Sequence, residues 1–190
     1  MTSILKADTI QDTDGNNIIN ENSNTITIGA SGDTTNIIGT LQNNGAAVGG
    51  TNTPAFLATR SAVQSIANAT ATKVQFDTEL FDTDNTYDNS TNYRFTPGVA
   101  GKYVITSMVK LQNCGTDKIL YNSIYKNGSV LSPASSVQLS GRNDDHSNIV
   151  TVIDVANTTD YYHIEVYHDA GGSRDLLVNN TYFSGYKIIE

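Results

Sequence analysis

The run from Tyr87 to Tyr103, YDNSTNYRFTPGVAGKY, constrains the fold of this chain more than any other stretch. Phe95 ends a short extended segment. The Pro97-Gly98 pair that follows predicts a turn, because proline restricts φ and glycine tolerates positive φ. The chain then enters an alternating strand at Gly101. An aromatic-anchored strand, a turn and a second strand in this order indicate a β-sandwich, and the run holds no catalytic chemistry.

Apolar and polar residues alternate on both sides of this run. Between Val74 and Leu80, every second residue is apolar or threonine, which predicts a strand with one buried face. From 103 to 111 the odd-numbered residues form one strand face. The opposite face carries Val104 and Met108, so we expect part of that face to be covered as well.

Turn signals separate further strand patterns. The Asn127-Gly128 pair predicts a type I′ hairpin, because this turn requires positive φ at both central residues. Strand patterns follow at residues 149–155, 162–167 and 182–189. Many short strands with turns between them predict an all-β fold, a two-sheet sandwich, over residues 54–190.

Residues 1–53 follow a different pattern. Short apolar pairs such as Ile18-Ile19 and Ile37-Ile38 recur at intervals of roughly eight to ten residues, with turn-forming residues between them. No pair alone builds a core. We therefore interpret the segment as a β-rich fibrous stalk or anchor, stable only when neighbouring chains complete its hydrophobic layers. A disordered leader rich in Asn and Gly is the alternative, and residues 49–53 resemble a flexible joint.

Composition excludes several function classes. The formal net charge of -8 and the pI near 4.6 argue against nucleic-acid binding, which needs clustered Lys and Arg. The opening MTSILKADTIQDTDG lacks the apolar core of an export signal and the length of a membrane span. We therefore predict no nucleic-acid partner, no membrane insertion and no secretion by a signal peptide. The single cysteine, Cys114, allows no intrachain disulfide and is expected to be an inert strand-end residue.

The sequence contains no recognisable catalytic motif. Its three histidines, His146, His163 and His168, have no Ser, Cys or carboxylate at a catalytic spacing. His163 shares a strand face with Glu165 and Tyr167, where we expect an exposed histidine. We predict no enzyme and no catalytic residue, and a hydrolase on a sandwich scaffold is the alternative.

A group of aspartates in one loop is the best candidate for a metal site. Asp82, Asp84 and Asp88, together with Asp77, offer oxygen ligands of the kind that calcium prefers. We predict no resident cofactor or metal, with calcium at this loop as the alternative.

Tyrosine is the dominant aromatic residue, and exposed tyrosines are able to stack on sugar rings. However, Tyr93, Tyr103, Tyr125, Tyr162 and Tyr182 lie in strand patterns, where we expect them to fill the sandwich or an interface between subunits. The sequence therefore predicts no particular sugar-binding residue.

The run YDNSTNYRFTPGVAGKY resembles the central signature of the C1q globular head, which is related to the tumour necrosis factor jelly roll. Three further segments match in the expected order: PAFLATRS from Pro54, YKNGS from Tyr125 and TYFSGY from Thr181. The resemblance covers roughly residues 54 to 190. The residues that match the family pattern are Tyr87, Phe95, Pro97, Gly101, Tyr103, Asn127, Gly128, Phe183 and Gly185. These positions maintain the fold, so they imply architecture only.

The resemblance implies a ten-stranded jelly roll that assembles as a compact homotrimer and displays its loops for recognition. Animal relatives carry a collagen repeat and a signal peptide, and this chain has neither. The opening ILKADTIQDTDGNNI instead is similar to leaders of structural proteins in marine tailed bacteriophages. An animal complement-type or cytokine-type role is therefore not expected.

Taken together, these resemblances predict a bacteriophage virion protein that forms a short homotrimeric fibre. Residues 1–53 would dock on other virion proteins, and the head of residues 54–190 would project outward. The short stalk favours a head fibre or capsid decoration that stabilises the shell or adheres to cell surfaces. The first alternative is a tail-fibre or tail-tip protein that recognises host surface polysaccharide. A free bacterial carbohydrate-binding module is the second alternative.

Overall fold

A computed structural model describes residues 9–11, 13, 17–22, 25–28, 31–39, 41–43, 46–47, 52–131, 135–139 and 145–188. The chain separates into two compact units, residues 1–50 and 51–190. The predicted boundary near Pro54 lies close to this division, and the virion-anchoring role of residues 1–53 stays a prediction.

In the described part of the first unit, the strands form two small antiparallel groups. One is a three-stranded sheet in the order β1 (Thr9–Gln11), β2 (Asn17–Asn22) and β3 (Thr25–Ile28). The other pairs β4 (Gln42–Asn43) with β5 (Ala46–Ala47). The first 50 residues thus contain strands, as their β-rich pattern predicts.

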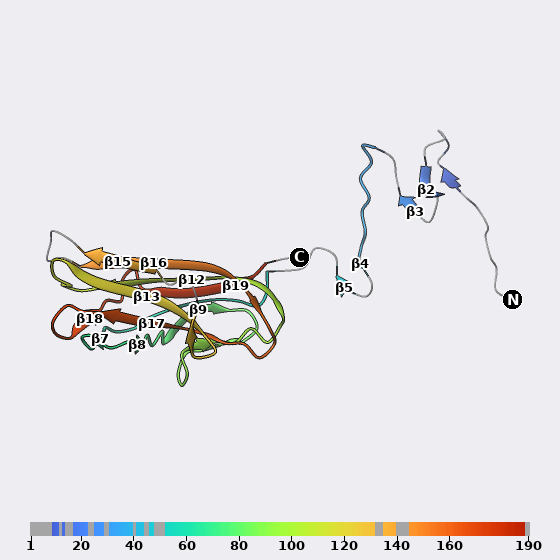
Figure 1. Ribbon diagram of the computed structural model, residues 1–190. Coiled ribbons are helices and arrows are strands. Elements are labelled where there is room, and N and C mark those ends of the chain that lie inside the picture. The colour runs from blue at the N-terminus through green and yellow to red at the C-terminus, as the bar shows by residue number, and fades with distance from the viewer. Residues whose placement is uncertain are drawn as a thin grey trace. The chain divides into compact units, whose positions relative to one another are not determined.

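The second unit is a sandwich of two seven-stranded sheets (Figure 1). The first sheet runs in the order β7 (Gln64–Ile66), β18 (Arg174–Leu176), β12 (Gly101–Leu111), β19 (Tyr182–Lys187), β6 (Ala55–Thr59) and β9 (Thr78–Asp82), and β16 (His146–Ala156) pairs with β12. The second runs β10 (Tyr87–Asp88), β11 (Arg94–Phe95), β17 (Tyr162–His168), β13 (Lys118–Lys126) and β14 (Ser129–Val130), with β15 (Ser135–Leu139) on β13 and β8 (Thr72–Lys73) on β17.

This architecture confirms the all-β two-sheet jelly roll. All strand pairings in the second unit are antiparallel, and strands far apart in sequence lie side by side, as β12 does with β16 and β19. The two seven-stranded sheets differ from the ten strands that the resemblance implies. The difference arises because two-residue segments such as β8, β10 and β11 count as separate strands.

Aromatic rings fill the space between the sheets. Phe56 lies at their centre, with ring centroids 4.8 Å from Tyr87, 4.5 Å from Phe95 and 4.9 Å from Phe183. These rings are almost fully buried, and close aromatic packing of this kind adds to the free energy gained from burying their area. The run from Tyr87 to Tyr103 therefore stabilises the sandwich, since it contributes three buried rings, those of Tyr87, Phe95 and Tyr103.

The strand predicted from Val74 to Leu80 forms only in part. Val74 and Phe76 are buried as expected, but the strand β9 begins at Thr78. Leu80 is 62% exposed, so its prediction as a core residue is wrong. The physical reason is a bulge in the pairing of β6 with β9: Leu57 pairs with Phe81 and the next residue pairs with Glu79, so Leu80 is the extra residue.

The Asn127-Gly128 hairpin forms as predicted. Asn127 and Gly128 have φ of 52° and 81°, and they connect β13 directly to β14. The Asn127 side chain also holds the loop before β17: its Nδ2 donates to Asp160 Oδ1 at 2.8 Å, and its Oδ1 accepts from the Tyr161 backbone N–H at 3.0 Å. The type I′ turn therefore does more than reverse the chain, because it fixes a neighbouring loop.

Candidate functional site

The outward face of the first sheet is an uncharged surface five strands wide. Three rows of cross-strand partners run across β16, β12, β19 and β6, and the middle row reaches β9. The rows consist of Ile153, Val104, Tyr186 and Ala55; Thr151, Thr106, Ser184, Leu57 and Phe81; and Ile149, Met108, Tyr182 and Thr59. We call these thirteen residues the uncharged face, because none of them is Asp, Glu, Lys or Arg.

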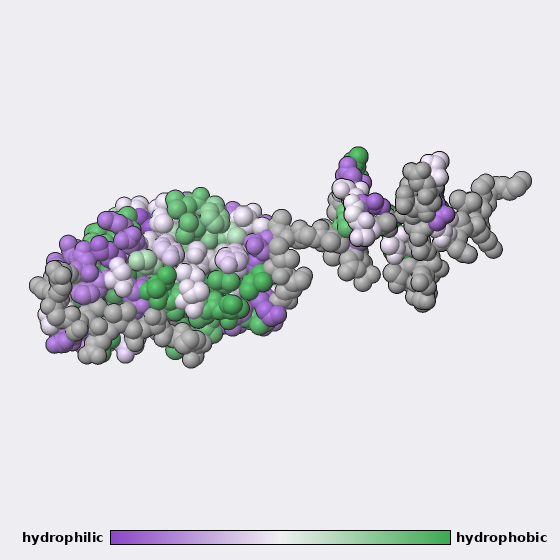
Figure 2. All heavy atoms as spheres, turned by 90° about the horizontal axis from the view of Figure 1, so that it is seen from above, coloured by the Kyte–Doolittle hydropathy of each residue, from purple (hydrophilic) through white to green (hydrophobic). Residues whose placement is uncertain are grey.

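Large apolar side chains on this face are in contact with solvent. Ile153 is 67% exposed, and Ile149, Tyr186 and Phe81 are also exposed. Between β6, β9 and β19 the surface forms an apolar groove of about 480 Å³ with Leu57, Leu80, Phe81, Tyr182 and Tyr186 among its lining residues. Figure 2 shows apolar side chains at several places on the face of the head that it presents, among polar ones. Exposed apolar patches of this kind mark interaction surfaces.

The sequence indicated only part of the uncharged face. The expectation that Val104 and Met108 oppose the core face is confirmed by their half-buried outward positions. Phe81 and Leu80 were missed, because a bulge rather than a simple alternation brings them to the surface. No pattern within one strand reveals that five strands lie in this order. The width of the face is therefore seen only in the structure.

The aspartates proposed as a cation site lie in and beside the loop from β9 to β10. Asp82 accepts hydrogen bonds from the Thr86 hydroxyl and the Tyr87 backbone N–H. Asp88 accepts from the backbone N–H groups of Ser90, Thr91 and Asn92, which lower the pKa of its carboxyl. Both carboxylates therefore stabilise the loop itself.

Asp84 is exposed, and Asp77 accepts from Ser61 at the far end of β9. Among the described residues, no group of three or more His, Cys, Asp or Glu side chains is placed to hold a metal ion. Calcium at Asp82, Asp84 and Asp88 stays the untested alternative, and loop hydrogen bonds account for the positions of Asp82 and Asp88.

The same loop forms one wall of a polar cleft of about 620 Å³. Its lining includes Glu79, Asn85, Asp88, Asn89, Arg94 and Thr96. Partial burial raises the pKa of the Glu79 carboxyl, and the nearby charges of Asp82 and Asp88 raise it further. Arg94 supplies the positive charge, with its guanidinium 4.4 Å from the centre of the Tyr161 ring. Carboxylate, guanidinium, amide and hydroxyl groups in one cleft suit a ligand that is rich in hydroxyl groups.

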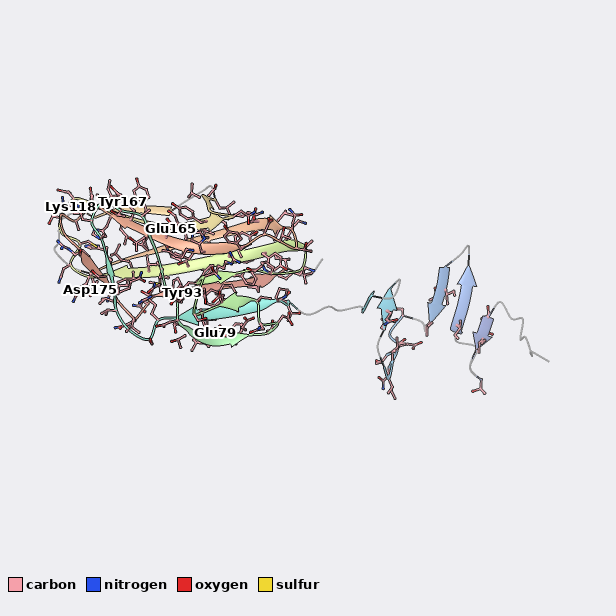
Figure 3. The ribbon with its side chains drawn as sticks, turned by 90° about the horizontal axis from the view of Figure 1, so that it is seen from below. Glu79, Tyr93, Lys118, Glu165, Tyr167 and Asp175 are labelled. Carbon is pink, nitrogen blue, oxygen red and sulfur yellow. The ribbon has the colours of Figure 1, made fainter. Side chains whose placement is uncertain are left out.

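His163 lies on the outward face of the second sheet, but it is only 3% exposed, so the expectation of an exposed histidine is wrong. Tyr125 covers it with ring centroids 5.1 Å apart, and its Nε2 lies 3.0 Å from Glu165 Oε1. Its Nδ1 is buried without a hydrogen-bond partner among the described residues. Figure 3 labels Glu165 and Tyr167, which share this face of β17. Alternation alone missed the burial, because neighbouring large side chains cover the ring.

The other two histidines also lack a catalytic arrangement. His168 Nε2 lies 3.0 Å from the Ile66 carbonyl oxygen, and its Nδ1 accepts from the Ala170 backbone N–H at 3.2 Å, so both ring nitrogens stabilise the fold. His146 begins β16 and is half-buried. Cys114 is fully buried, and burial raises the pKa of its thiol to about 11, which is the inert character expected of it.

The tyrosines divide between the core and the outer surfaces. Tyr103 and Tyr162 fill the sandwich, as expected. Tyr125 instead covers His163 on the outward face of the second sheet, and Tyr182 lies in the uncharged face. Tyr93 takes a positive φ of 50° beside Arg94 at the start of β11.

The residues of the family pattern occupy structural positions. Tyr87 donates its hydroxyl to the Phe76 carbonyl oxygen at 3.1 Å, and Tyr103 donates to the Val99 carbonyl oxygen at 2.8 Å. Pro97 is buried, and Gly101 starts β12 with φ of 152°. These contacts stabilise the fold, and Tyr87 and Gly185 also line the polar cleft and the apolar groove.

Comparison with solved structures identifies the fold. The globular domain of zebrafish complement 1qA matches with a TM-score of 0.52 at 17% identity, over 72% of this chain and 98% of that chain. Murine APRIL matches with 0.53 at 11% identity, over 70% and 98%. Vertex protein P5 of phage PRD1 matches with 0.53 at 17% identity, over 74% and 100%. At these identities the likeness concerns the fold alone.

Sequence comparisons reach the same region. No curated protein sequence matches the chain. The described residues contain no helix with the length and apolar character that crossing a membrane requires. The model of the C1q domain family matches residues 55–188, which is the whole of the sandwich. With that match over most of its length, and with the jelly roll that the structure shows, the chain belongs to the C1q domain family.

Proposed function

We propose that this protein is a bacteriophage virion component that forms a short homotrimeric fibre. The uncharged face is the observation that carries the proposal, because thirteen neighbouring residues without a charge are suited to contact other copies. C1q and tumour necrosis factor-like domains usually form homotrimers. Such domains are typically not enzymes, and the burial of His163 and His168 supports a role in binding rather than catalysis.

Residues 1–53 dock on the particle in this proposal, and the sandwich projects outward. The opening resemblance to phage structural proteins supports this placement. The shared fold of PRD1 vertex protein P5 gives weaker support, since fold alone does not transfer function. We favour a head fibre or capsid decoration, and a tail-fibre or tail-tip protein is the alternative.

The mass of the full-length protein in solution tests the assembly. We expect light scattering to give about three times the chain mass of 20.4 kDa. A monomer at micromolar concentration would contradict the homotrimer and leave the uncharged face without its proposed occupant.

Immunogold labelling of intact virions tests the placement. We expect antibodies against the sandwich to label the capsid. Label at the tail tip would favour the tail-fibre alternative, and virions without label would exclude the virion role. If the protein is instead a free bacterial carbohydrate-binding module, it should bind glycans and should be found on no virion.

The polar cleft favours adhesion to a polysaccharide as a second function of the head. Its mixture of charged, amide and hydroxyl side chains matches the many hydroxyl groups of a sugar chain. We expect Glu79→Ala to weaken binding to immobilised host polysaccharide at least tenfold. Asp175→Ala removes an exposed carboxylate from β18, which does not line the cleft, and serves as the matched control. Equal binding by both variants would locate adhesion elsewhere.

A further inference from the structure

The three-stranded sheet of the first unit carries a row of exposed isoleucines. Ile10 pairs with Ile19, and Ile19 pairs with Ile28, so one isoleucine from each strand lies in the same cross-strand row. Directly paired residues of an antiparallel sheet project from the same face. The three side chains are 40%, 38% and 54% exposed. Ile26, two residues before Ile28, lies on the same face and is also exposed.

The next row along these strands projects from the opposite face and is polar. Thr9 and Thr27 both pair with the backbone of Asn20, and both threonines are exposed. Because side chains alternate between faces, the threonines and the isoleucines lie on opposite sides of the sheet. The two rows therefore differ in character, with isoleucines on one side of the sheet and threonines on the other.

The row follows from a spacing in the sequence. Ile10, Ile19 and Ile28 are nine residues apart, and the same interval reaches Ile37. The first two intervals return the chain to the row in the neighbouring strand, whereas Ile37 lies beyond the sheet. A regular return of one apolar residue is the pattern of an element that completes its core by stacking on other copies.

A small sheet with one bare apolar face needs a second layer to be stable. We propose that the isoleucine face of residues 9–28 packs against the same face of two further copies of this chain, so that three sheets enclose one apolar core. This inference rests on the proposed homotrimer. Trimeric heads would hold three identical sheets close together, at an effective concentration on the order of millimolar. At this concentration, even weak contacts between the sheets favour their association. The row itself contains no charge, and the charged residue of this face, Glu21, lies one pair beyond the row as the partner of Ile26.

Disulfide trapping in the full-length protein tests the contact. Ile19→Cys places a thiol in the middle of the row, and Thr27→Cys places one on the opposite face as the matched control. The natural Cys114 is buried and stays unchanged. On oxidation we expect Ile19→Cys to give covalent dimers on a non-reducing gel and Thr27→Cys to stay monomeric, because a disulfide needs Cα atoms within about 7 Å. Equal cross-linking of both variants, or of neither, would overturn the inference.

Hydrogen exchange combined with light scattering separates this inference from the homotrimer. In the native protein we expect slow amide exchange over residues 17–28. The variant Ile19→Thr should keep three times the chain mass while these amides exchange at least tenfold faster. A trimeric mass with fast exchange in the native protein would overturn the packing of the sheets and leave the homotrimer intact. A monomeric mass would refute both.

Discussion

The position of Gly185 in strand β19 requires glycine, because its neighbours leave little space for a side chain. A Cβ built at this position would lie 3.1 Å from Ile105 Cδ1, 3.1 Å from Phe56 Cε1 and 3.3 Å from the Val104 carbonyl oxygen. Its backbone conformation does not require glycine, so close packing across β6, β12 and β19 is the reason for it. A position that a family pattern marks only as glycine is thereby explained by contacts.

Gly185→Val should lower the free energy of unfolding by about 1–3 kcal/mol, because added carbons in a packed core displace their neighbours. Denaturant unfolding measures the change. Gly172→Val is the control, since a Cβ at Gly172 would approach only the end of the Arg174 side chain, at 3.4 Å. Equal losses in the two variants would refute the packing explanation.

His163 should make the stability of the protein depend on pH. Burial lowers its pKa below the usual 6.5, and this effect outweighs the attraction of Glu165, while Lys73 and Arg94 lower the pKa further. The unfolded chain therefore binds a proton at higher pH than the folded chain does. Stability should fall as the pH drops below about 6.5, and the fall should end below the folded pKa.

His163→Gln should reduce this slope, as urea unfolding between pH 7 and pH 5 would reveal. His146→Gln provides the comparison, because His146 lies outside the cluster around Tyr125. A slope that is unchanged in His163→Gln would show that other groups cause the dependence.

At the scale of elements, the hairpin of β13 and β14 joins the two sheets through one charged cluster. Lys126 Nζ lies 2.8 Å from Asp154 Oδ2 on β16 and 3.0 Å from Asp160 Oδ2. The Tyr162 hydroxyl donates to Asp154 Oδ2 at 2.6 Å. Asp160 also accepts from Asn127, so the hairpin, the loop before β17 and the first sheet share one set of hydrogen bonds. Such a shared network couples the elements more strongly than separate surface ion pairs do.

Asp160 should protect the fold against acid. The Asn157 backbone N–H and the Asn127 amide hold the pKa of its carboxyl at about 2, below the ordinary 3.8. Its contribution to stability is therefore complete above about pH 4 and disappears as the pH falls toward 2. We expect Asp160→Asn to be less stable at pH 7 and to approach the native protein near pH 2. Acid titration followed by circular dichroism measures this, with Asp175→Asn as an exposed control. A constant difference between pH 7 and pH 2 would contradict the role.

At the scale of the whole molecule, the outward faces of the two sheets differ in kind. The first sheet presents the uncharged face, whereas the second presents Tyr125, Glu165, Arg94 and Lys73 around a buried histidine. A surface that packs against other copies is expected to lack charge, whereas a surface that stays in solvent is expected to carry charged and polar side chains. The proposed trimer therefore uses the first sheet for assembly.

Ile153→Asp should convert the proposed trimer to monomers without unfolding them. In the trimer it would bury a carboxylate in an apolar contact, which is costly unless the charge is paired. In the monomer Ile153 is 67% exposed, so the aspartate would be solvated. Val130→Asp makes the same change at an exposed residue of β14 in the second sheet. Light scattering should show one chain mass for Ile153→Asp and three for Val130→Asp, and a trimeric Ile153→Asp would exclude this face as the interface.

The sequence predicted the sandwich because its signals are local. Alternation places Tyr103 in the core, and the Asn127-Gly128 pair predicts its own turn. The candidate surfaces depend on strand order and on irregular pairing, which local patterns do not contain. Leu80 reaches the surface through a bulge, and His163 stacks with Tyr125 from β13 and with Tyr161, two residues before it. The polar cleft likewise joins β9 to residues that follow it through a folded loop.

The bulge at Leu80 also has a consequence for the proposed assembly, because it lies in a strand at the edge of the first sheet. β9 is the last strand of the first sheet, and a regular edge strand offers its free backbone groups to any passing strand. The extra residue interrupts the regular spacing of those groups, so an added strand would not keep its register there. At this edge the proposed trimer would therefore use side-chain contacts between faces and not an added strand. The same irregularity that the sequence pattern does not predict thus disfavours the addition of a further strand at β9.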